Sequence, residues 1–305
     1  MNKISIKDST LAFIFASLLS QVFVGVFLVF AFAICLSFGL NINLDWFANN
    51  CWGYLLCAIA LNFSLFLNFF YFKRKKEDKI IKKPEIKKIL TYILIAVIAF
   101  FMLYPAINLI EILLTNIGVK QADPPILKTT TDFIVSIVSM ALLPAIFEEL
   151  VFRGIIFSGL KQKGKSFAIL ISALMFSLFH LSIHQTIYPF VMGMLFGCIM
   201  FKENNILYTI ITHFVCNLLS LIHSYFGLWF ISTHWLYIIV AILLFVAFLT
   251  FVLVYAIRSN KEQKEKLTKN DKIYLSFALG IVSILWIIIN FVNFLWKIKI
   301  SLKLD

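Results

Sequence analysis

Long apolar stretches alternate with short polar connections along the whole chain. A helix rises about 1.5 Å per residue, so it needs about 20 mostly apolar residues to cross the hydrocarbon core of a bilayer. Nine candidate stretches cover residues 10–39, 51–73, 89–115, 131–158, 166–184, 187–202, 206–227, 232–257 and 273–296. The pattern therefore predicts an all-α, polytopic transmembrane bundle of about eight to nine spans.

The sixth stretch is the weakest candidate for a full span. Only about 15 residues separate Gln185 from the charged Lys202, which is short for a crossing, so we expect a tilted or re-entrant helix there. No repeat of fixed period, Gly/Ser linker or soluble domain interrupts the pattern. We divide the bundle into N-terminal helices (residues 1–130), a central part (131–227) and C-terminal helices (228–305).

Composition supports a protein whose main partner is the lipid bilayer. Of the 305 residues, 62% are hydrophobic and only 14% are charged, and the mean hydropathy is +0.96. A water-soluble domain of this size could not bury so much apolar surface. The first apolar run, from about Ser9 to Leu40, is too long for a signal-peptide core. We interpret it as a retained helix of a multi-pass protein of the cell membrane.

The net charge of +12 has a topological explanation. Basic residues concentrate in residues 73–88 and 258–272, with a smaller cluster at 161–165. Short loops rich in Lys and Arg stay in the cytoplasm, so these connections and residues 1–8 are predicted inside. Residues 41–50 and 116–130 are then outside, and so, against the rule, are Lys297, Lys299 and Lys303. Because the charge serves orientation, we exclude nucleic acid as a partner.

Three ionisable residues lie inside the fourth stretch: Glu148, Glu149 and Arg153. Each charge at the centre of a membrane helix costs about 2.5 to 3.5 kcal/mol, so such residues point to a site. Glu149 and Arg153 are at i,i+4 spacing, which permits an ion pair. Glu148 falls on another face, beside Ala145 and after a kink expected at Pro144. Glu148 is therefore the candidate for proton transfer, whereas the pair could equally lock helices together.

The fifth stretch places Phe176, Ser177, His180 and His184 on one helical face. A histidine on an apolar helix is often a structural residue with a satisfied hydrogen bond. His180 and His184 at i,i+4 spacing could instead bind a metal, although His184 lies beside the predicted outer loop.

The seventh stretch carries a polar stripe, which cannot face lipid and must face protein or water. Its members recur at helical spacing: Thr209, His213, Asn217, Ser220 and Ser224. Hydrogen bonding between helices would explain the Ser and Thr residues well, but His213 and Asn217 poorly.

Together these residues could activate water for hydrolysis of a peptide bond. Glu148 would act as general base and then protonate the leaving amine, and Asn217 would stabilise the oxyanion. His180 and His213 would hold the water directly or bind Zn²⁺, with Glu148 as third ligand or as base. No G-x-G-x-x-G, Walker loop, H-E-x-x-H or serine elbow occurs in the chain.

Three motifs in order, E-E-x-x-x-R at 148–153, F-x-x-x-H at 176–180 and H-x-x-x-N at 213–217, resemble those of the CPBP (Abi) family of CAAX prenyl proteases and bacteriocin-processing enzymes. The resemblance covers about residues 135–222 and includes Gly193 and Gly197. It implies an all-helical intramembrane endopeptidase, with or without zinc, in which the residues matching Glu148, His180, His213 and Asn217 line a cavity between three or four central helices. Residues 1–130 and 228–305 carry no such motif.

We therefore expect an intramembrane peptidase acting on a peptide or a membrane protein. A Lys-, Ile-, Phe- and Asn-rich composition favours a bacterial source, and hence peptide maturation or bacteriocin self-immunity. A non-enzymatic immunity or scaffold protein is the alternative, and a transporter would need inverted repeats that the sequence lacks. The oligomeric state is open.

The three candidate residues differ in predicted depth. From the helical rise per residue, Glu148 and His213 lie about 10 to 15 Å from the inner surface and His180 nearer 20 Å. One shared site therefore requires that this difference in depth be closed.

Overall fold

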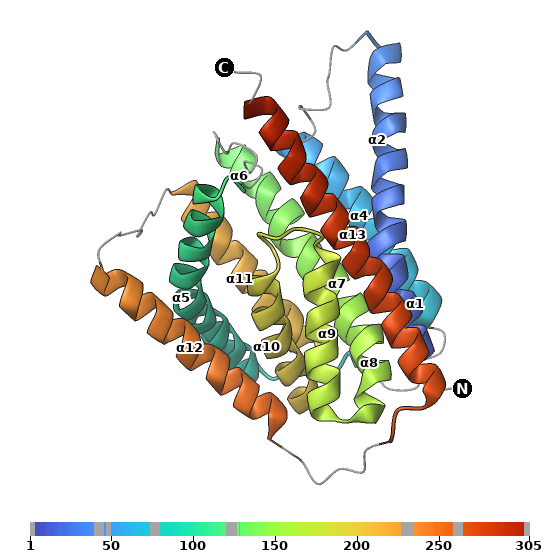
Figure 1. The fold of residues 1–305 in the computed structure, drawn as a ribbon, viewed down its shortest axis with the longest axis vertical. Coiled ribbons are helices and arrows are strands. Elements are labelled where there is room, and N and C mark those ends of the chain that lie inside the picture. Colours follow the sequence, from blue (N-terminus) through green and yellow to red (C-terminus); the bar gives the residue numbers. More distant parts are fainter. Residues whose placement is uncertain are drawn as a thin grey trace.

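The computed structural model describes residues 4–39, 46, 50–73, 80–119, 127, 129–226, 235–258 and 265–301, with the backbone alone at 295–301. Within these ranges the chain is helical and has no strand (Figure 1). The elements are α1 (Ile6–Ile14), η1 (Phe15–Leu19), α2 (Ser20–Ser37), α4 (Cys51–Lys73), α5 (Ile86–Asn116), α6 (Thr130–Ser136), η2 (Ile137–Leu142), α7 (Leu143–Val151), η3 (Phe152–Ile156), α8 (Phe157–Leu160), η4 (Lys161–Lys163), α9 (Lys165–Phe179), α10 (Ile187–Glu203), α11 (Ile206–Tyr225), α12 (Trp235–Ile257) and α13 (Lys269–Ser301).

The predicted all-α polytopic bundle is confirmed. In the described part of the chain, seven helical segments are long and apolar enough to cross a membrane: Ile6–Ser37, Cys51–Lys73, Ile86–Asn116, Thr130–Lys163, Ile206–Tyr225, Trp235–Ile257 and Lys269–Phe294. The two other predicted stretches form the shorter helices α9, with 15 residues, and α10, with 17. A short α10 was expected, whereas the early end of α9 was not.

The fifth stretch was predicted as a helix to residue 184, but α9 ends at Phe179. Leu181 adopts a left-handed conformation with φ of 51°, which a continuing helix does not allow. Asn290 of α13 stabilises this turn, because its Oδ1 accepts from the backbone N–H of Ile183 at 2.9 Å and its Nδ2 donates to the carbonyl of Leu181 at 3.3 Å. His184 therefore lies in a loop, and the expectation that His180 and His184 share a helical face is wrong.

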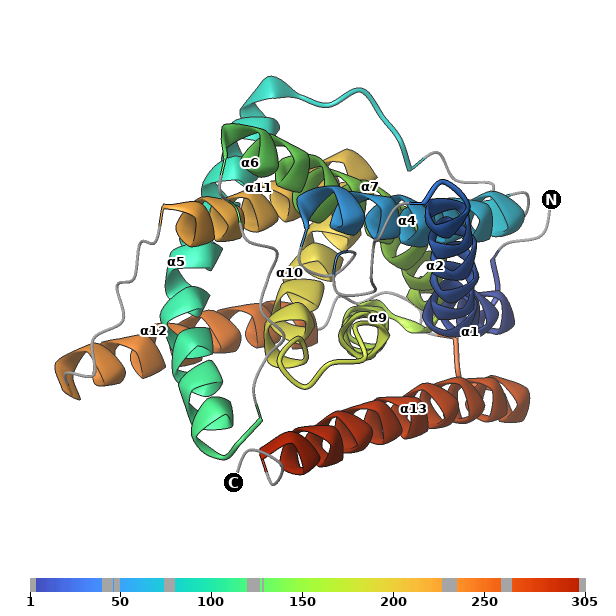
Figure 2. The ribbon, with the colours of Figure 1, turned by 90° about the horizontal axis from the view of Figure 1, so that it is seen from above.

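The central helices of the bundle are α7, α9, α10 and α11 (Figure 1). Helix α10 packs along α9, α11 contacts both α5 and α7, and α4 packs on α7. Helices α12 and α13 flank this centre, α12 against α5 and α13 against α1, as the view from above shows (Figure 2). Large apolar side chains are exposed along α2, α12 and α13, as expected where helices face lipid.

The fourth span is one long helical segment with two π-helical turns, η2 and η3, on either side of α7. Pro144 stands at the start of α7, directly after η2, so the kink expected at this proline takes the form of a wider helical turn. Single π turns recur at functional sites because they re-aim the side chains that follow. Here the side chains between the two turns include Glu148 and Glu149.

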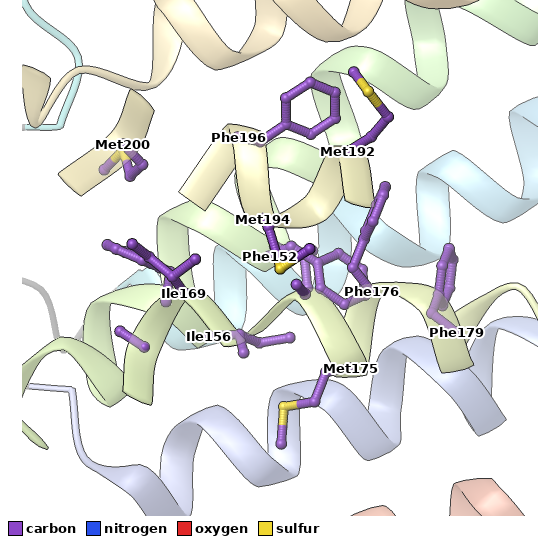
Figure 3. Packing of buried hydrophobic residues seen from close by; sticks show 14 of the residues in the cluster. Phe152, Ile156, Ile169, Met175, Phe176, Phe179, Met192, Met194, Phe196 and Met200 are labelled. Atoms are coloured by element: carbon purple, nitrogen blue, oxygen red, sulfur yellow. The ribbon is translucent and has the colours of Figure 1, made fainter. Parts of the chain in front are cut away.

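Close packing holds α9 against α10 (Figure 3). Phe176 and Phe196 come from these two helices and Phe152 from η3, and all three side chains are buried. A β-carbon placed on Gly193 would stand 3.0 Å from the Cα atom of Ala173, so only glycine fits there without a shift. The two helix backbones therefore approach one another beside the motif residues.

One end of the bundle gathers segments that the charge pattern predicts to be cytoplasmic. Gln162 Nε2 donates to the carbonyl of Ile4 at 2.6 Å, and Lys163 Nζ lies 3.3 Å from Glu265 and 3.2 Å from Asp271. The 161–165 cluster thus shares an end with the start of α1 and the start of α13. Most of the loops predicted outside, 41–50 and 116–130, lie beyond the described residues, as do 1–3, 74–79, 259–264 and the side chains of Lys297, Lys299 and Lys303.

Candidate active site

The ion pair predicted between Glu149 and Arg153 is present. Arg153 Nη1 donates to Glu149 Oε1 at 2.9 Å, and both side chains are fully buried. An arginine suits this position because its fork of donors stays charged and can bind several acceptors at once. The two charges compensate each other inside the bundle.

Arg153 also connects its own helix to α10. Its Nη2 donates to the carbonyl of Gly193 at 3.1 Å, and its guanidinium lies over the rings of Phe176 and Phe196 at 4.6 and 5.1 Å. Cation–π contacts of this kind are strongest where water is excluded. The packing of α10 is thus tied to the charge on Arg153.

His213 on α11 bridges the two glutamates of α7. Its Nδ1 lies 3.0 Å from Glu149 Oε1, and its Nε2 lies 3.9 Å from Glu148 Oε2. An ionised carboxylate only accepts hydrogen bonds, so in the neutral imidazole Nδ1 carries the proton and Nε2 keeps its lone pair. From the sequence we predicted only the contact between Glu149 and Arg153. The contact with His213 was missed, because residue spacing within one helix does not show which residues of another helix lie beside it.

His180 sits at the C-terminal cap of α9. Its Nδ1 is 2.8 Å from the carbonyl of Phe176, which accepts the N–H and again leaves Nε2 with a lone pair. The ring of Phe176 makes edge contacts with His180 at 5.0 Å and with His213 at 5.8 Å. The two imidazoles therefore lie on the same aromatic side chain.

A cavity of about 660 Å³ lies at the centre of the bundle. Its walls include Glu148, His180, His213 and Asn217, so residues of all three motifs reach one space. The gap in depth estimated from the sequence is thereby closed, since His180 and His213 also contact the same ring, that of Phe176. Glu149 and Arg153 are not among the lining residues and lie behind the wall.

The polar stripe of the seventh stretch divides into two parts. Ser220 and Ser224 line the cavity together with His213 and Asn217. Thr209 does not, and its hydroxyl donates to the carbonyl of Ile206 at 2.9 Å. This hydrogen bond stays within α11, so Thr209 does not connect two helices in the way that the alternative interpretation of the Ser and Thr residues proposed.

A second polar pair in the cavity wall was missed at the sequence level. His184 Nδ1 lies 2.6 Å from Oε2 of Glu111 on α5, and both residues line the cavity. Tyr104 and Asn108 line it as well, so Tyr104, Asn108 and Glu111 form a face of α5 at helical spacing. An acid inside the apolar stretch 89–115 was the signal that could have revealed it.

The donor chemistry around Glu148 would suit zinc, because two imidazole Nε2 atoms carry lone pairs beside a carboxylate. The positions of these side chains do not suit zinc. In the ranges that the structure describes, no group of three or more His, Cys, Asp or Glu side chains could hold a metal ion. Glu148, His180 and His213 would have to move together to form a three-ligand site.

Residues 130–219 match the family model of the type II CAAX prenyl endopeptidases, Rce1-like. This segment is similar to an Rce1-like domain and makes up less than a third of the chain. The match spans all three motifs and confirms the resemblance to the CPBP and CAAX protease family. With the seven apolar helices, it supports a multi-pass membrane protein with the general activity of an intramembrane protease. No curated protein and no solved structure matches the chain.

Proposed function

We propose that the protein is an intramembrane endopeptidase in which Glu148 activates the attacking water. The observation that carries this proposal is the approach of Glu148 Oε2 and His213 Nε2 to 3.9 Å at the wall of a cavity that His180 and Asn217 also line. A carboxylate, two imidazoles and an amide are sufficient for general acid–base hydrolysis of an amide.

The spacing between Glu148 and His213 suits a bridging water. At 3.9 Å the two side chains are too far apart for a direct hydrogen bond. A water between them would donate one hydrogen to the Glu148 carboxylate and the other to His213 Nε2, which has a free lone pair because Nδ1–H is committed to Glu149. His180 Nε2 offers a further acceptor in the same cavity.

The reaction then follows from these positions. Glu148 takes a proton from the water as the water oxygen bonds to the scissile carbonyl carbon, and the carbonyl electron pair moves onto its oxygen. The amide of Asn217 donates a hydrogen bond to that oxyanion. As the oxyanion collapses, the carbon–nitrogen bond breaks and Glu148 delivers its proton to the leaving amine. Glu148 ends as it began, as a carboxylate.

Glu149 and Arg153 act as positioning residues in this mechanism. Glu149 holds His213 in one tautomer, and Arg153 holds Glu149 in place through the same oxygen. Neither side chain lines the cavity, so neither is assigned contact with the substrate.

We derive no step through zinc, because the candidate ligands Glu148, His180 and His213 do not converge on one point. The substrate in this proposal is a peptide or a membrane protein. Peptide maturation or bacteriocin self-immunity in a bacterial cell membrane is the setting that the sequence favours.

The test is cleavage of candidate peptides by the purified full-length protein in lipid vesicles. Glu148→Gln preserves the shape of the side chain but removes the base, and His213→Ala removes the water's second acceptor. General acid–base groups contribute about 10² to 10⁴ in rate, so each variant should lower kcat by at least about 100-fold. Glu85→Gln, the same change on a side chain that is 67% exposed, is the matched control.

Membrane insertion and thermal unfolding of each variant separate lost chemistry from lost folding. Full cleavage by Glu148→Gln and His213→Ala would contradict the proposal. A wild-type protein that binds peptides and cleaves none would favour the alternative, a non-enzymatic immunity or scaffold protein.

A further inference from the structure

The cavity contains a second pair of ionisable residues that the proposed reaction does not use. Glu111 lies near the end of α5, and His184 lies in the loop after α9. Their side chains meet at 2.6 Å between Oε2 and Nδ1, and both line the cavity that Glu148 lines. The cavity wall therefore carries two acidic residues, Glu111 and Glu148.

Burial shows which atoms of this pair remain available. The His184 side chain is only 6% exposed, and its Nε2 has no hydrogen-bond partner. The Glu111 side chain is 25% exposed and lines the cavity, while its Oε2 is held by His184. His184 thus fixes the direction of a carboxylate that a ligand in the cavity can reach.

The charge on the cavity wall is opposite to that of the protein as a whole. The chain carries a net charge of +12. Among the described residues that line the cavity, however, Glu111 and Glu148 are the acids and there is no Lys or Arg. Because apolar walls concentrate the field of such groups, the cavity attracts cations and disfavours anions.

We propose that Glu111, held by His184, binds a cationic group of the substrate: the ammonium or guanidinium of a Lys or Arg side chain, or a free N-terminal amine. This inference rests on the proposed peptidase function and specifies its substrate class, a basic peptide. A charge-assisted hydrogen bond between substrate and Glu111 would set which peptide bond lies beside Glu148. Glu111 would then be a specificity-determining residue, not a catalytic one.

The experiment measures binding, so that it does not depend on cleavage. The full chain with Glu148→Gln is placed in phosphatidylcholine nanodiscs, which carry no net lipid charge. Fluorescent, N-acetylated apolar peptides differ only at one position, which is Lys, norleucine or Glu. A fourth peptide has norleucine and a free N-terminus and distinguishes the two sources of positive charge.

The Lys peptide or the free-amine peptide should bind at least about tenfold more tightly than the neutral twin, and the Glu peptide more weakly than either. Adding Glu111→Gln should bring the ratio of the cationic to the neutral dissociation constant to about one, and Glu111→Lys should favour the Glu peptide. Adding Glu85→Gln should leave the ratio unchanged. A structural role for Glu111 would not invert the charge preference.

Equal binding of cationic and neutral peptides, or a preference that survives Glu111→Gln, would overturn the inference. Equal binding on the parent chain refutes the inference even if the Glu111 variants do not fold. Cleavage by the wild type without charge preference would refute the role of Glu111 alone. Charge-selective binding with no cleavage would support Glu111 and refute the peptidase.

Discussion

Nδ1 of His213 lies 3.0 Å from Oε1 of Glu149, and that same oxygen accepts from Arg153 at 2.9 Å. Arg153 and His213, which come from two different spans, thus both contact one carboxylate oxygen of Glu149 inside the bundle. Glu149 compensates the charge of Arg153 and also sets the tautomer of His213, so a single residue links the stability of the fold to the chemistry of the cavity.

Glu149→Gln should destabilise the protein by about 3 to 5 kcal/mol, because it leaves the fully buried Arg153 without a compensating charge. Thermal unfolding in detergent, followed by intrinsic fluorescence, measures the change against Glu85→Gln as control. An unchanged midpoint would show that Arg153 has another source of compensation.

The double variant Glu149→Gln with Arg153→Met should recover much of the lost stability, because removing both partners of a buried ion pair is far less costly than removing one. Cleavage should stay low, since His213 would still lack the carboxylate that fixes its tautomer. Recovery of activity together with stability would mean that Glu149 serves the fold alone.

Gly193→Ala should destabilise the protein by about 1 to 3 kcal/mol, because its β-carbon would meet the backbone of Ala173 at 3.0 Å and push α10 away from α9. The shift would also displace the carbonyl that accepts from Arg153. Gly197→Ala is the matched control, since its β-carbon would meet Ile169 at an ordinary 3.4 Å. Equal unfolding midpoints for the two variants would contradict this account.

Asn290→Leu should lower kcat about tenfold, although Asn290 does not line the cavity. The change removes both hydrogen bonds that hold the turn at Leu181 and Ile183, directly after His180, and small displacements of catalytic groups are costly in rate. Asn293→Leu, an exposed position on the same helix, is the control. If both variants cleave equally well, the turn is stable without α13.

Cleavage should persist after treatment with a zinc chelator, because Glu148, His180 and His213 do not form a three-ligand group in this structure. Elemental analysis of the purified protein gives the independent measurement. Loss of cleavage on chelation, with recovery on adding Zn²⁺, would instead require these side chains to converge on a metal.

The sequence predicted those features that depend on position within one helix. The i,i+4 spacing of Glu149 and Arg153 gave their ion pair, and hydropathy gave the membrane bundle. The bond between Glu149 and His213 could not be read in this way, because it joins side chains 64 positions apart on helices whose relative rotation the sequence leaves open.

The end of α9 was misjudged for a related reason. The predicted helix continued past Phe179, whereas the backbone turn at Leu181 is stabilised by Asn290, more than a hundred residues away. Glu111 is a different case. It was visible as an acid in an apolar stretch, by the same criterion that singled out Glu148, but it belongs to none of the three motifs.

The turn held by Asn290 also defines the smallest part of the chain that can be studied as a unit. The family match ends at residue 219, yet the backbone beside His180 finds its partners on α13, and Ser9 of α1 donates to the carbonyl of Ile156 at 3.0 Å. A fragment cut to the matched segment would lose these partners, and the carbonyl of Ile156 would stay unpaired inside the bundle, away from water. The flanking helices, which carry none of the motifs, are therefore integral to the machinery, and a minimal enzyme would have to retain both ends of the chain.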